Sequence, residues 1–165
     1  MLQLTLIRHA KSSWKDTSLS DFDRPLNKRG LENAPLMGRV LKKLGLDFDR
    51  MIASPALRAI TTARLIARQL GYPAEDIDTR EELYAAGTRQ LLDCIHSLHN
   101  GDTRVALVAH NPGLTELCNY LCGEMIANLP TCSIAVIEFE LDDWRAVFRN
   151  SGRLALYEYP RKYTD

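Results

Sequence analysis

Two periods of hydrophobic positions run along the chain, one of two residues and one of three to four. Leucines alternate with polar residues over residues 2–6, which is typical of a strand. Short apolar runs at 50–53 and 105–109 indicate buried strands, and the second is typical of a central strand in a parallel sheet. A weaker strand is expected near Ile77. Leu154–Tyr157 is a candidate for the last strand.

Helical spacing of the apolar residues fills the stretches between these strands. The expected helices are residues 28–44, 55–70, 88–99 and 112–122. Three of them follow a residue whose side chain can cap a helix N-terminus: Asn27, Ser54 and Asn111. Three end before a glycine: Gly45, Gly71 and Gly123.

Strands that alternate with helices predict an α/β fold in three layers, with a mostly parallel sheet and helices on both faces. Residues 133–141 and 144–149 alternate on either side of Asp142 and Asp143, which predicts an antiparallel hairpin at the edge. The polar residues 10–26 form a long loop, and a loop of this length inside a compact domain is usually functional. We expect residues 1–165 to form a single domain.

Charge and composition exclude several classes of protein. The 165 residues carry 21 Lys and Arg against 21 Asp and Glu, so a chain-wide nucleic-acid or anionic-membrane surface is not expected. The apolar stretch Met1–Ile7 is too short for a secretory signal or a membrane helix. We therefore expect a cytoplasmic protein that contacts neither nucleic acid nor membrane.

The four cysteines and the remaining histidines give no metal signal. No CxxC pair is present, and we interpret Cys94, Cys118, Cys122 and Cys132 as small core residues. His96 and His99 lie three apart on a predicted helix without a third ligand nearby, so we interpret them as surface residues. We expect no metal and no cofactor.

Charged and polar residues follow the ends of the predicted strands. Ligands of open α/β sheets bind outside the carboxyl ends of the strands, so these residues are candidates for a site. They are Arg8 and His9, then Ser54 and Arg58, then Arg80, Glu81 and Glu82, and finally His110. The two histidines, the arginines Arg8 and Arg58, and one of the two carboxylates are thus expected at one edge of the sheet.

Phosphoryl transfer without a metal fits these side chains. Arginine presents a planar fork of donors that suits phosphate oxygens, and helix N-termini add to an anion site. A neutral histidine can attack phosphorus, and the nearby arginines are expected to lower the pKa of His9 and keep it neutral. His110, if protonated, adds a donor to the transferring group, and a carboxylic acid protonates the leaving group.

Four segments carry a resemblance to a known family. They are LIRHAKSSW (6–14), DFDRPLNKRG (21–30), SPALRAITTA (54–63) and LVAHNPGLTEL (107–117). In this order they resemble the histidine phosphatase superfamily, also called phosphoglycerate mutase-like. The form with RHAKSSW and HNPG in a short chain looks like the SixA-type phosphohistidine phosphatase branch.

The resemblance implies a role for each matching residue. His9 is the nucleophile that becomes phosphorylated, Arg8 and Arg58 bind the phosphate, and His110 completes the pocket. Ser12 falls where relatives place a loop residue near the phosphate, and Lys15 stands where mutase-like members carry Asn after the Trp. The proton donor is expected to be Glu81, which lies three residues before Tyr84 as in mutase-like members, with Glu82 as the alternative.

Several functions stay open from the sequence. The leading one is a metal-independent phosphatase that acts on a protein phosphohistidine and releases inorganic phosphate. The short stretch between 71 and 99 leaves little room for a lid, and an open site suits a protein surface. The alternatives are a phosphatase or mutase acting on a small phosphate ester, a phosphate-binding module without catalysis, and a metal hydrolase using His9 and His110.

Overall fold

A computed structural model of the chain describes residues 1–164 and has a single six-stranded sheet at its centre. The strand order is β3-β2-β4-β1-β5-β6, in which β3, β2, β4 and β1 run parallel to one another. The strands are β1 (Leu2–Arg8), β2 (Arg50–Ala53), β3 (Asp78–Thr79), β4 (Arg104–Ala109), β5 (Ile134–Phe139) and β6 (Gly152–Glu158). Because β5 is antiparallel to both β1 and β6, the strand β6 runs in the same direction as β1.

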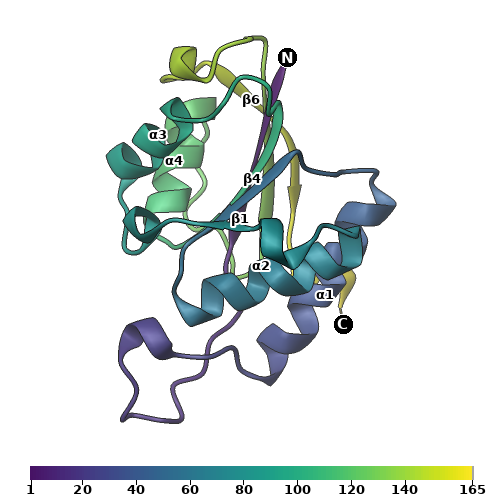
Figure 1. The fold of residues 1–165 in the computed structure, drawn as a ribbon, viewed down its shortest axis with the longest axis vertical. Coiled ribbons are helices and arrows are strands. Elements are labelled where there is room, and N and C mark those ends of the chain that lie inside the picture. Colours follow the sequence, from purple (N-terminus) through teal and green to yellow (C-terminus); the bar gives the residue numbers. More distant parts are fainter. Residues whose placement is uncertain (165) are drawn as a thin grey trace.

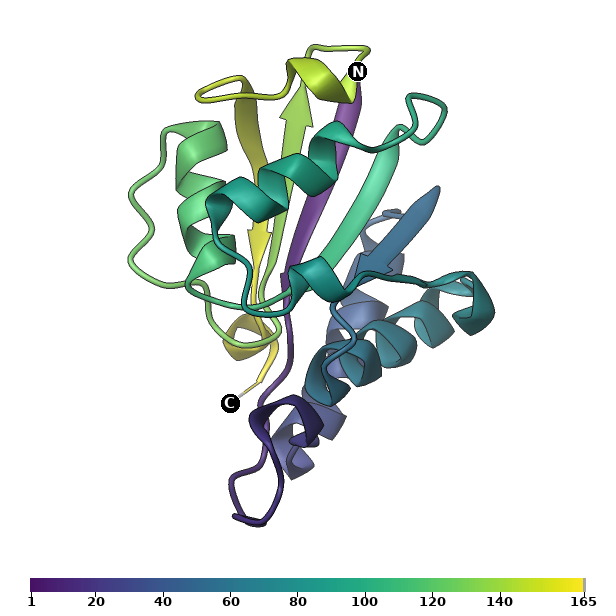
Figure 2. The same cartoon turned by 60° about the vertical axis from the view of Figure 1, so that its left-hand side comes forward.

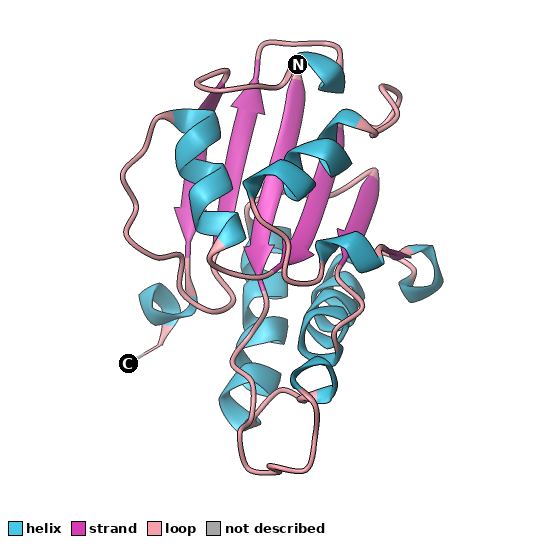
Figure 3. Cartoon of the chain, turned by 90° about the vertical axis from the view of Figure 1, so that its left-hand side faces the viewer, coloured by secondary structure: helices cyan, strands magenta, loops and turns pink. Residues whose placement is uncertain are grey.

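Two helices cover each face of the sheet, so the predicted three-layer α/β fold is confirmed (Figure 1). The helices are α1 (Lys28–Lys43), α2 (Leu57–Leu70), α3 (Thr88–His96) and α4 (Gly113–Cys122). The alternation along β1 separates the two cores. Leu4 and Leu6 pack with α3 and α4, whereas Ile7 packs with α1 and α2. Figure 3 shows the helices on the two sides of the strands.

The predicted helix ends hold at some positions and fail at others. The Asn27 side chain accepts a hydrogen bond from the Gly30 amide, and Gly71 and Gly123 end their helices in the left-handed conformation. Ser54 was expected to cap α2, but this helix begins at Leu57. Asn111 is likewise not the cap of α4, whose preceding residue is Pro112.

The edge hairpin is formed by a different pair of strands from the predicted one. Strand β5 pairs with β6, whereas the segment after Asp143 forms a short 3-10 helix at Trp144–Ala146. Trp144 is fully buried against Phe139, and its indole N–H donates to the Asp102 carbonyl over 2.7 Å. The apolar residues of this segment cover one end of the core. Packing therefore decides the conformation of this segment, although its alternating pattern predicted a strand.

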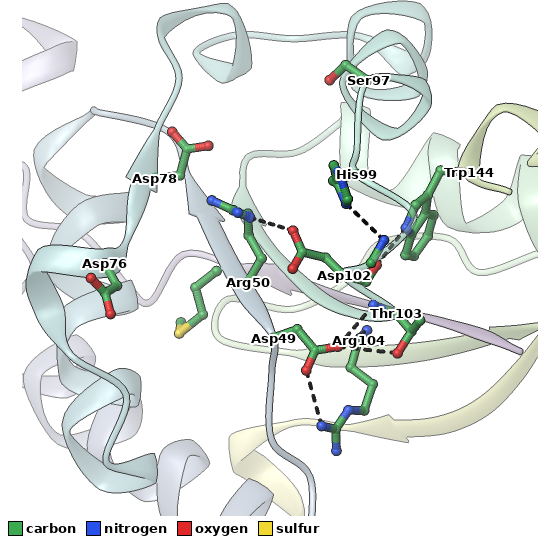
Figure 4. A network of polar contacts seen from close by, with 12 residues as sticks. Asp49, Arg50, Asp76, Asp78, Ser97, His99, Asp102, Thr103, Arg104 and Trp144 are labelled. Carbon is green, nitrogen blue, oxygen red and sulfur yellow. Dashed lines mark hydrogen bonds and ion pairs between the residues drawn. The ribbon is translucent and has the colours of Figure 1, made fainter. Parts of the chain in front are cut away.

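Acidic residues at the amino ends of β2 and β4 form hydrogen bonds and ion pairs with each other's strand (Figure 4). These contacts lie at the end of the sheet opposite the strands' carboxyl ends. One Asp49 carboxylate oxygen accepts from the amides of Thr103 and Arg104, each over 3.0 Å. Arg50 pairs with Asp102 over 2.9 Å. These contacts join the starts of two neighbouring parallel strands.

The cysteines agree with their interpretation as small core residues. All four cysteines are free thiols; Cys94, Cys118 and Cys132 are buried, and Cys122 is partly buried. Within residues 1–164, no helix combines the length and the apolar character that crossing a membrane requires.

Candidate active site

The carboxyl ends of β1, β2 and β4 bring the predicted basic residues together. Arg8 is the last residue of β1 and lies opposite Ala109, the last residue of β4. His9 and His110 follow these two residues, and their ring centroids lie 5.2 Å apart. Arg58 lies in the first turn of α2, directly after β2. The parallel pairing of β1 with β4 therefore sets the two imidazoles side by side.

One nitrogen of His9 is fixed by the backbone. Its Nδ1 lies 2.8 Å from the Ala10 carbonyl oxygen, so Nδ1 carries the proton and donates it. Ala10 is itself held, because its amide donates to the Thr62 hydroxyl over 2.9 Å. The lone pair is left on Nε2, which has no hydrogen-bond partner among the described residues. His9 is buried, and the hydrogen bond between the Ala10 amide and Thr62 holds the backbone next to it.

Burial keeps both histidines neutral. Burial, together with the charges of Arg58, Arg8 and Arg24, lowers the pKa of His9 to about 4, against a smaller raising effect of the Ala10 hydrogen bond. Burial and the neighbouring His9 lower the pKa of His110 to about 3. The arginine charges contribute to the low pKa of His9, but desolvation is the larger cause. Because its pKa is about 3, His110 is not in the protonated form that would supply an extra donor.

The hydrogen bond of His110 nevertheless leaves it a donor. Its Nε2 lies 2.8 Å from the Ser54 hydroxyl, which also accepts from the Ala56 amide over 3.3 Å. The Ser54 hydroxyl has no other acceptor for its proton among residues 1–164, so we assign that proton to the bond with Nε2. The proton of His110 then lies on Nδ1, which is buried and has no partner among residues 1–164. A neutral His110 thus presents an unsatisfied N–H.

The two predicted arginines are held by different partners. Arg8 Nη1 donates to the Leu129 carbonyl over 2.7 Å, while its Nε is buried without a partner in the described chain. Burial lowers the pKa of Arg8 from its usual value. Arg58 donates to the main-chain oxygen of Asp21 over 2.7 Å and to its carboxylate over 3.0 Å.

Asp21 is part of this cluster, which the sequence did not predict. Its carboxylate accepts from Arg58, from Arg24 over 2.9 Å and from the Tyr84 hydroxyl over 2.6 Å. The Tyr84 hydrogen bond and the two arginines lower the pKa of Asp21 to about 2 against the effect of burial. Its charge balances part of the arginine cluster.

Arg24 is a third arginine at the site and, like Arg58, it is buried. Its guanidinium bonds the Ser12 hydroxyl and the Ser13 carbonyl, and it lies 3.2 Å from the centre of the Trp14 ring. The signal in the sequence is a single arginine in a polar loop, which by itself indicates a solvated side chain. Its burial depends on the return of the loop, where Ser12 pairs with Leu26.

The remaining predicted residues lie farther from these contacts. Lys15 is exposed; its amide donates to the Ser13 hydroxyl over 3.2 Å, and its side chain bonds no described residue. Glu81 and Glu82 are exposed in the 3-10 turn Glu81–Leu83, and neither side chain makes a hydrogen bond or ion pair with a described residue. The turn itself lies beside the site, because the Tyr84 ring packs edge-on against His110 at 5.7 Å.

The arrangement suits a tetrahedral oxyanion. Buried guanidinium groups and the His110 N–H supply donors, and the neutral Nε2 of His9 supplies an electron pair. Among residues 1–164 there is no group of three or more His, Cys, Asp or Glu side chains placed to hold a metal ion. His96 bonds the Val147 carbonyl, and His99 accepts from the Gly101 amide.

Comparisons with known proteins agree with this geometry. The model of the histidine phosphatase superfamily (branch 1) matches residues 4–85. An uncharacterized chloroplastic protein of Arabidopsis thaliana is 30% identical over 158 residues, covering 91% of this chain and 72% of the relative. An uncharacterized protein of Mycobacterium tuberculosis is 29% identical and covers 94% of this chain and 100% of the relative.

Solved structures extend the likeness over the whole fold. The structure of the protein histidine phosphatase SixA complexed with tungstate is 25% identical, with a TM-score of 0.85. The match covers 99% of this chain and 100% of that chain. A structure from Agrobacterium tumefaciens that carries the SixA name is also 25% identical, with a TM-score of 0.83. The match covers 96% of this chain and 98% of that one. The resemblance to the SixA-type branch is confirmed at this level, and the chain belongs to the histidine phosphatase superfamily.

Proposed function

We propose that this protein is a phosphatase that forms a covalent phosphohistidine at Nε2 of His9. The observation that carries the proposal is the hydrogen bond from His9 Nδ1 to the Ala10 carbonyl, which directs the free electron pair to Nε2. The low pKa of His9 keeps that pair available at neutral pH. Arg8, Arg58 and His110 are proposed to hold the phosphoryl oxygens.

Two displacements at phosphorus complete the reaction. In the first, Nε2 of His9 forms a bond to phosphorus while the bond from phosphorus to the leaving atom breaks, and the leaving atom takes up a proton. In the second, a water oxygen attacks phosphorus and passes a proton to the group that protonated the leaving atom. The bond to Nε2 breaks, and inorganic phosphate leaves. The arginines and the His110 N–H stabilise the charge on the equatorial oxygens in both steps.

We propose Glu81 as the group that protonates the leaving atom, with Glu82 as the alternative. The turn that carries Glu81 is joined to the site through Tyr84, whose amide donates to the Glu81 carbonyl over 3.0 Å. Its exposure suits a donor that meets a substrate arriving from solvent. Ser12 and Lys15 are proposed to contribute through the loop, Ser12 by fixing Arg24.

The proposed substrate is a protein that carries phosphohistidine. Support comes from the SixA structure, which is named a protein histidine phosphatase and binds tungstate, an oxyanion with the shape of phosphate. A phosphoramidate nitrogen can be protonated before it leaves, so a site whose candidate acid is exposed suits this bond better than an alkyl ester. We place the activity in the cytoplasm and expect no metal or cofactor.

Rapid quenching with a ³²P-labelled substrate tests the proposal. We expect an acid-labile, alkali-stable phosphoenzyme in the wild type, none in His9→Ala, inhibition by vanadate, and full activity in EDTA. The substrate is tested with a phosphohistidine-bearing protein beside a panel of small phosphate esters. Turnover by His9→Ala at the wild-type rate contradicts the mechanism. Phosphate binding without a phosphoenzyme indicates a binding module instead, and preference for a small ester indicates a metabolic phosphatase or mutase.

A further inference from the structure

A second basic pocket lies at the same edge of the sheet as the candidate active site. Its volume is about 400 Å³, and its lining includes Lys11, Arg29, Asn33, Thr131, Tyr159 and Arg161. We call it the flanking basic pocket. The residues of the candidate site described above do not line it, so it is a separate hollow.

The charge of the flanking basic pocket is not balanced within the described chain. Lys11, Arg29 and Arg161 are exposed, and none of them forms an ion pair or a side-chain hydrogen bond with any residue from 1 to 164. The described residues that line the pocket include no carboxylate. Most other arginines at strand ends are paired, for example Arg104 with Asp49 and Arg80 with Asp78. The pocket therefore concentrates positive charge in a chain whose net charge is zero.

Helix α1 adds to this positive potential. Arg29 lies in the first turn of α1, where no acidic residue is present. A cation in a first turn is unfavourable beside the positive end of the helix dipole, unless an anion binds there. The Asn33 amide and the Thr131 and Tyr159 hydroxyls supply uncharged donors beside the cations.

The chain places this pocket next to the reacting histidine. Lys11 lies two residues after His9, and Thr131 lies between Leu129, whose carbonyl holds Arg8, and Cys132, whose amide donates to the His9 carbonyl over 3.0 Å. Arg161 follows β6, which runs in the direction of β1 two strands away. The ends of β1 and β6 are thus roughly 10 Å apart, at about 4.8 Å per strand spacing.

The ribbon shows at which end of the sheet the segments of the pocket lie. The loop after β1 and the C-terminal segment lie at the same end of the sheet in Figure 2, and the N-terminus lies at the other end. The C-terminal 3-10 helix, Pro160–Tyr163, contacts α1 (Figure 1). The pocket is therefore built from four segments that meet beside the site: the loop after β1, the start of α1, the loop before β5, and the segment after β6.

We propose that the flanking basic pocket binds carboxylate side chains of the protein substrate, three to four residues from the phosphohistidine in an extended segment. The inference rests on the proposed function, since it names a feature of that substrate. An extended chain advances about 3.3 Å per residue, so three residues span the separation between the ends of β1 and β6. The pocket then aligns the phosphorylated residue with His9.

The form of the pocket favours carboxylates over a second phosphate. The candidate active site holds its anion with buried guanidinium groups of fixed position, whereas the cations of the flanking basic pocket are exposed and come from three separate segments. Such charges suit several solvated carboxylates and steer an acidic partner toward the site. The volume also exceeds what a single phosphate group fills.

Matched peptides test this inference. Phosphohistidine peptides of equal length carry either two Glu or two Gln residues at the third and fourth positions from the phosphohistidine, on one side or the other. We expect kcat/KM for the better Glu peptide to exceed that for its Gln counterpart by about tenfold at low salt, mainly through KM. The preference is expected to shrink toward zero at 0.5 M salt, because exposed charges are screened.

The variant Arg29→Glu/Arg161→Glu is expected to abolish the preference for Glu while turning over p-nitrophenyl phosphate at the wild-type rate. Its control is Arg39→Glu/Arg64→Glu, which makes the same charge change at two exposed helix positions that form no ion pair within residues 1–164. The control should keep the preference. Equal kcat/KM for the Glu and Gln peptides in the wild type, or a preference that survives in Arg29→Glu/Arg161→Glu, overturns the inference.

Binding measured without catalysis separates the inference from the proposed function. An unphosphorylated Glu-rich peptide is titrated into ¹⁵N-labelled protein, and amide shifts are expected at Arg29, Thr131 and Arg161 in the wild type but not in the double variant. If no phosphohistidine peptide is hydrolysed, the proposed substrate fails, and this titration still decides whether the pocket binds carboxylates. Absence of shifts at these amides overturns the inference even when the enzyme is active.

Discussion

Arg58 donates two hydrogen bonds to Asp21, one to its main-chain oxygen over 2.7 Å and one to its carboxylate over 3.0 Å. The buried Arg58, which we propose binds phosphate, is therefore oriented by a residue 37 positions earlier in the chain, which lies in the loop after β1. The same carboxylate accepts from Arg24 and Tyr84. Asp21 is thus a positioning residue, and its replacement is expected to disturb several donors at once.

We expect Asp21→Ala to lower kcat/KM for p-nitrophenyl phosphate by roughly tenfold to a hundredfold, mostly through KM, because two guanidinium groups lose a shared acceptor. Asp21→Asn keeps one acceptor oxygen and is expected to recover part of this loss. Steady-state kinetics on both variants measures the split between kcat and KM. Equal kinetics for Asp21→Ala and the wild type would show that Arg58 keeps its place without this contact.

The bond between Ser54 and His110 predicts a specific tautomer. We expect ¹⁵N NMR of the free protein at pH 7 to show His110 protonated at Nδ1, because the Ser54 hydroxyl donates to Nε2. Ser54→Ala should release this constraint and lower kcat by about tenfold, while the phosphoenzyme at His9 still forms. Protonation of His110 at Nε2 in the wild type would contradict the assignment, and Thr62→Ser serves as a control at a neighbouring buried hydroxyl.

The low pKa of His9 sets the acid limb of activity. Since burial and the arginine charges lower this pKa to about 4, the nucleophile stays unprotonated throughout the neutral range and loses its electron pair only near pH 4. We expect the Cε1–H resonance of His9, identified by its absence in His9→Gln, to titrate near pH 4. A midpoint near 6.5, the value of an ordinary histidine, would show that the imidazole is not desolvated.

Stability is expected to depend on pH through the same two histidines. Their pKa values are about 4 and 3 in the folded chain and near 6.5 when unfolded, so below pH 6.5 the unfolded state binds more protons. The free energy of unfolding should therefore fall as the pH drops from 6.5 toward 4. Between pH 7.5 and 4.5 we expect a loss of about 5 kcal/mol, measured by urea denaturation.

The double variant His9→Gln/His110→Gln provides the control for this pH dependence. It removes both buried imidazoles, so its stability should change by less than half as much over the same range. Asp21, with a pKa of about 2, stays ionised in the folded chain across this window and contributes little to the difference. A wild type whose stability is flat between pH 7.5 and 4.5 would contradict the burial of neutral histidines.

The role of Glu81 is tested by varying the leaving group. Glu81→Gln should leave turnover of p-nitrophenyl phosphate near the wild-type rate, since that leaving group departs as an anion, and should lower turnover of an alkyl phosphate by about a hundredfold. Glu82→Gln is the matched control on the same exposed turn. A larger loss in Glu82→Gln would transfer the proposed role to Glu82, and no loss in either variant would remove the proposed donor.

The sequence by itself determined the elements and the local chemistry. The alternation in β1, the apolar run in β4 and the caps at Asn27 and Gly71 depend on neighbours a few residues away, so their patterns survive in the sequence. The basic residues at the strand ends are found for a related reason. Parallel strands place their carboxyl ends at one edge of the sheet, so a residue that directly follows a strand lies at that edge.

Only the tertiary structure decided the contacts made across the long loop and between helices. The polar pattern around Asp21 and Arg24 does not show that the loop folds back so that Asp21 bonds both Arg24 and Arg58. Burial of a charge depends on partners that lie far away in the sequence. The same reason explains Ser54, whose hydroxyl bonds His110 rather than capping α2. It also explains the neutral His110, because the desolvation that lowers its pKa comes from the packed site as a whole.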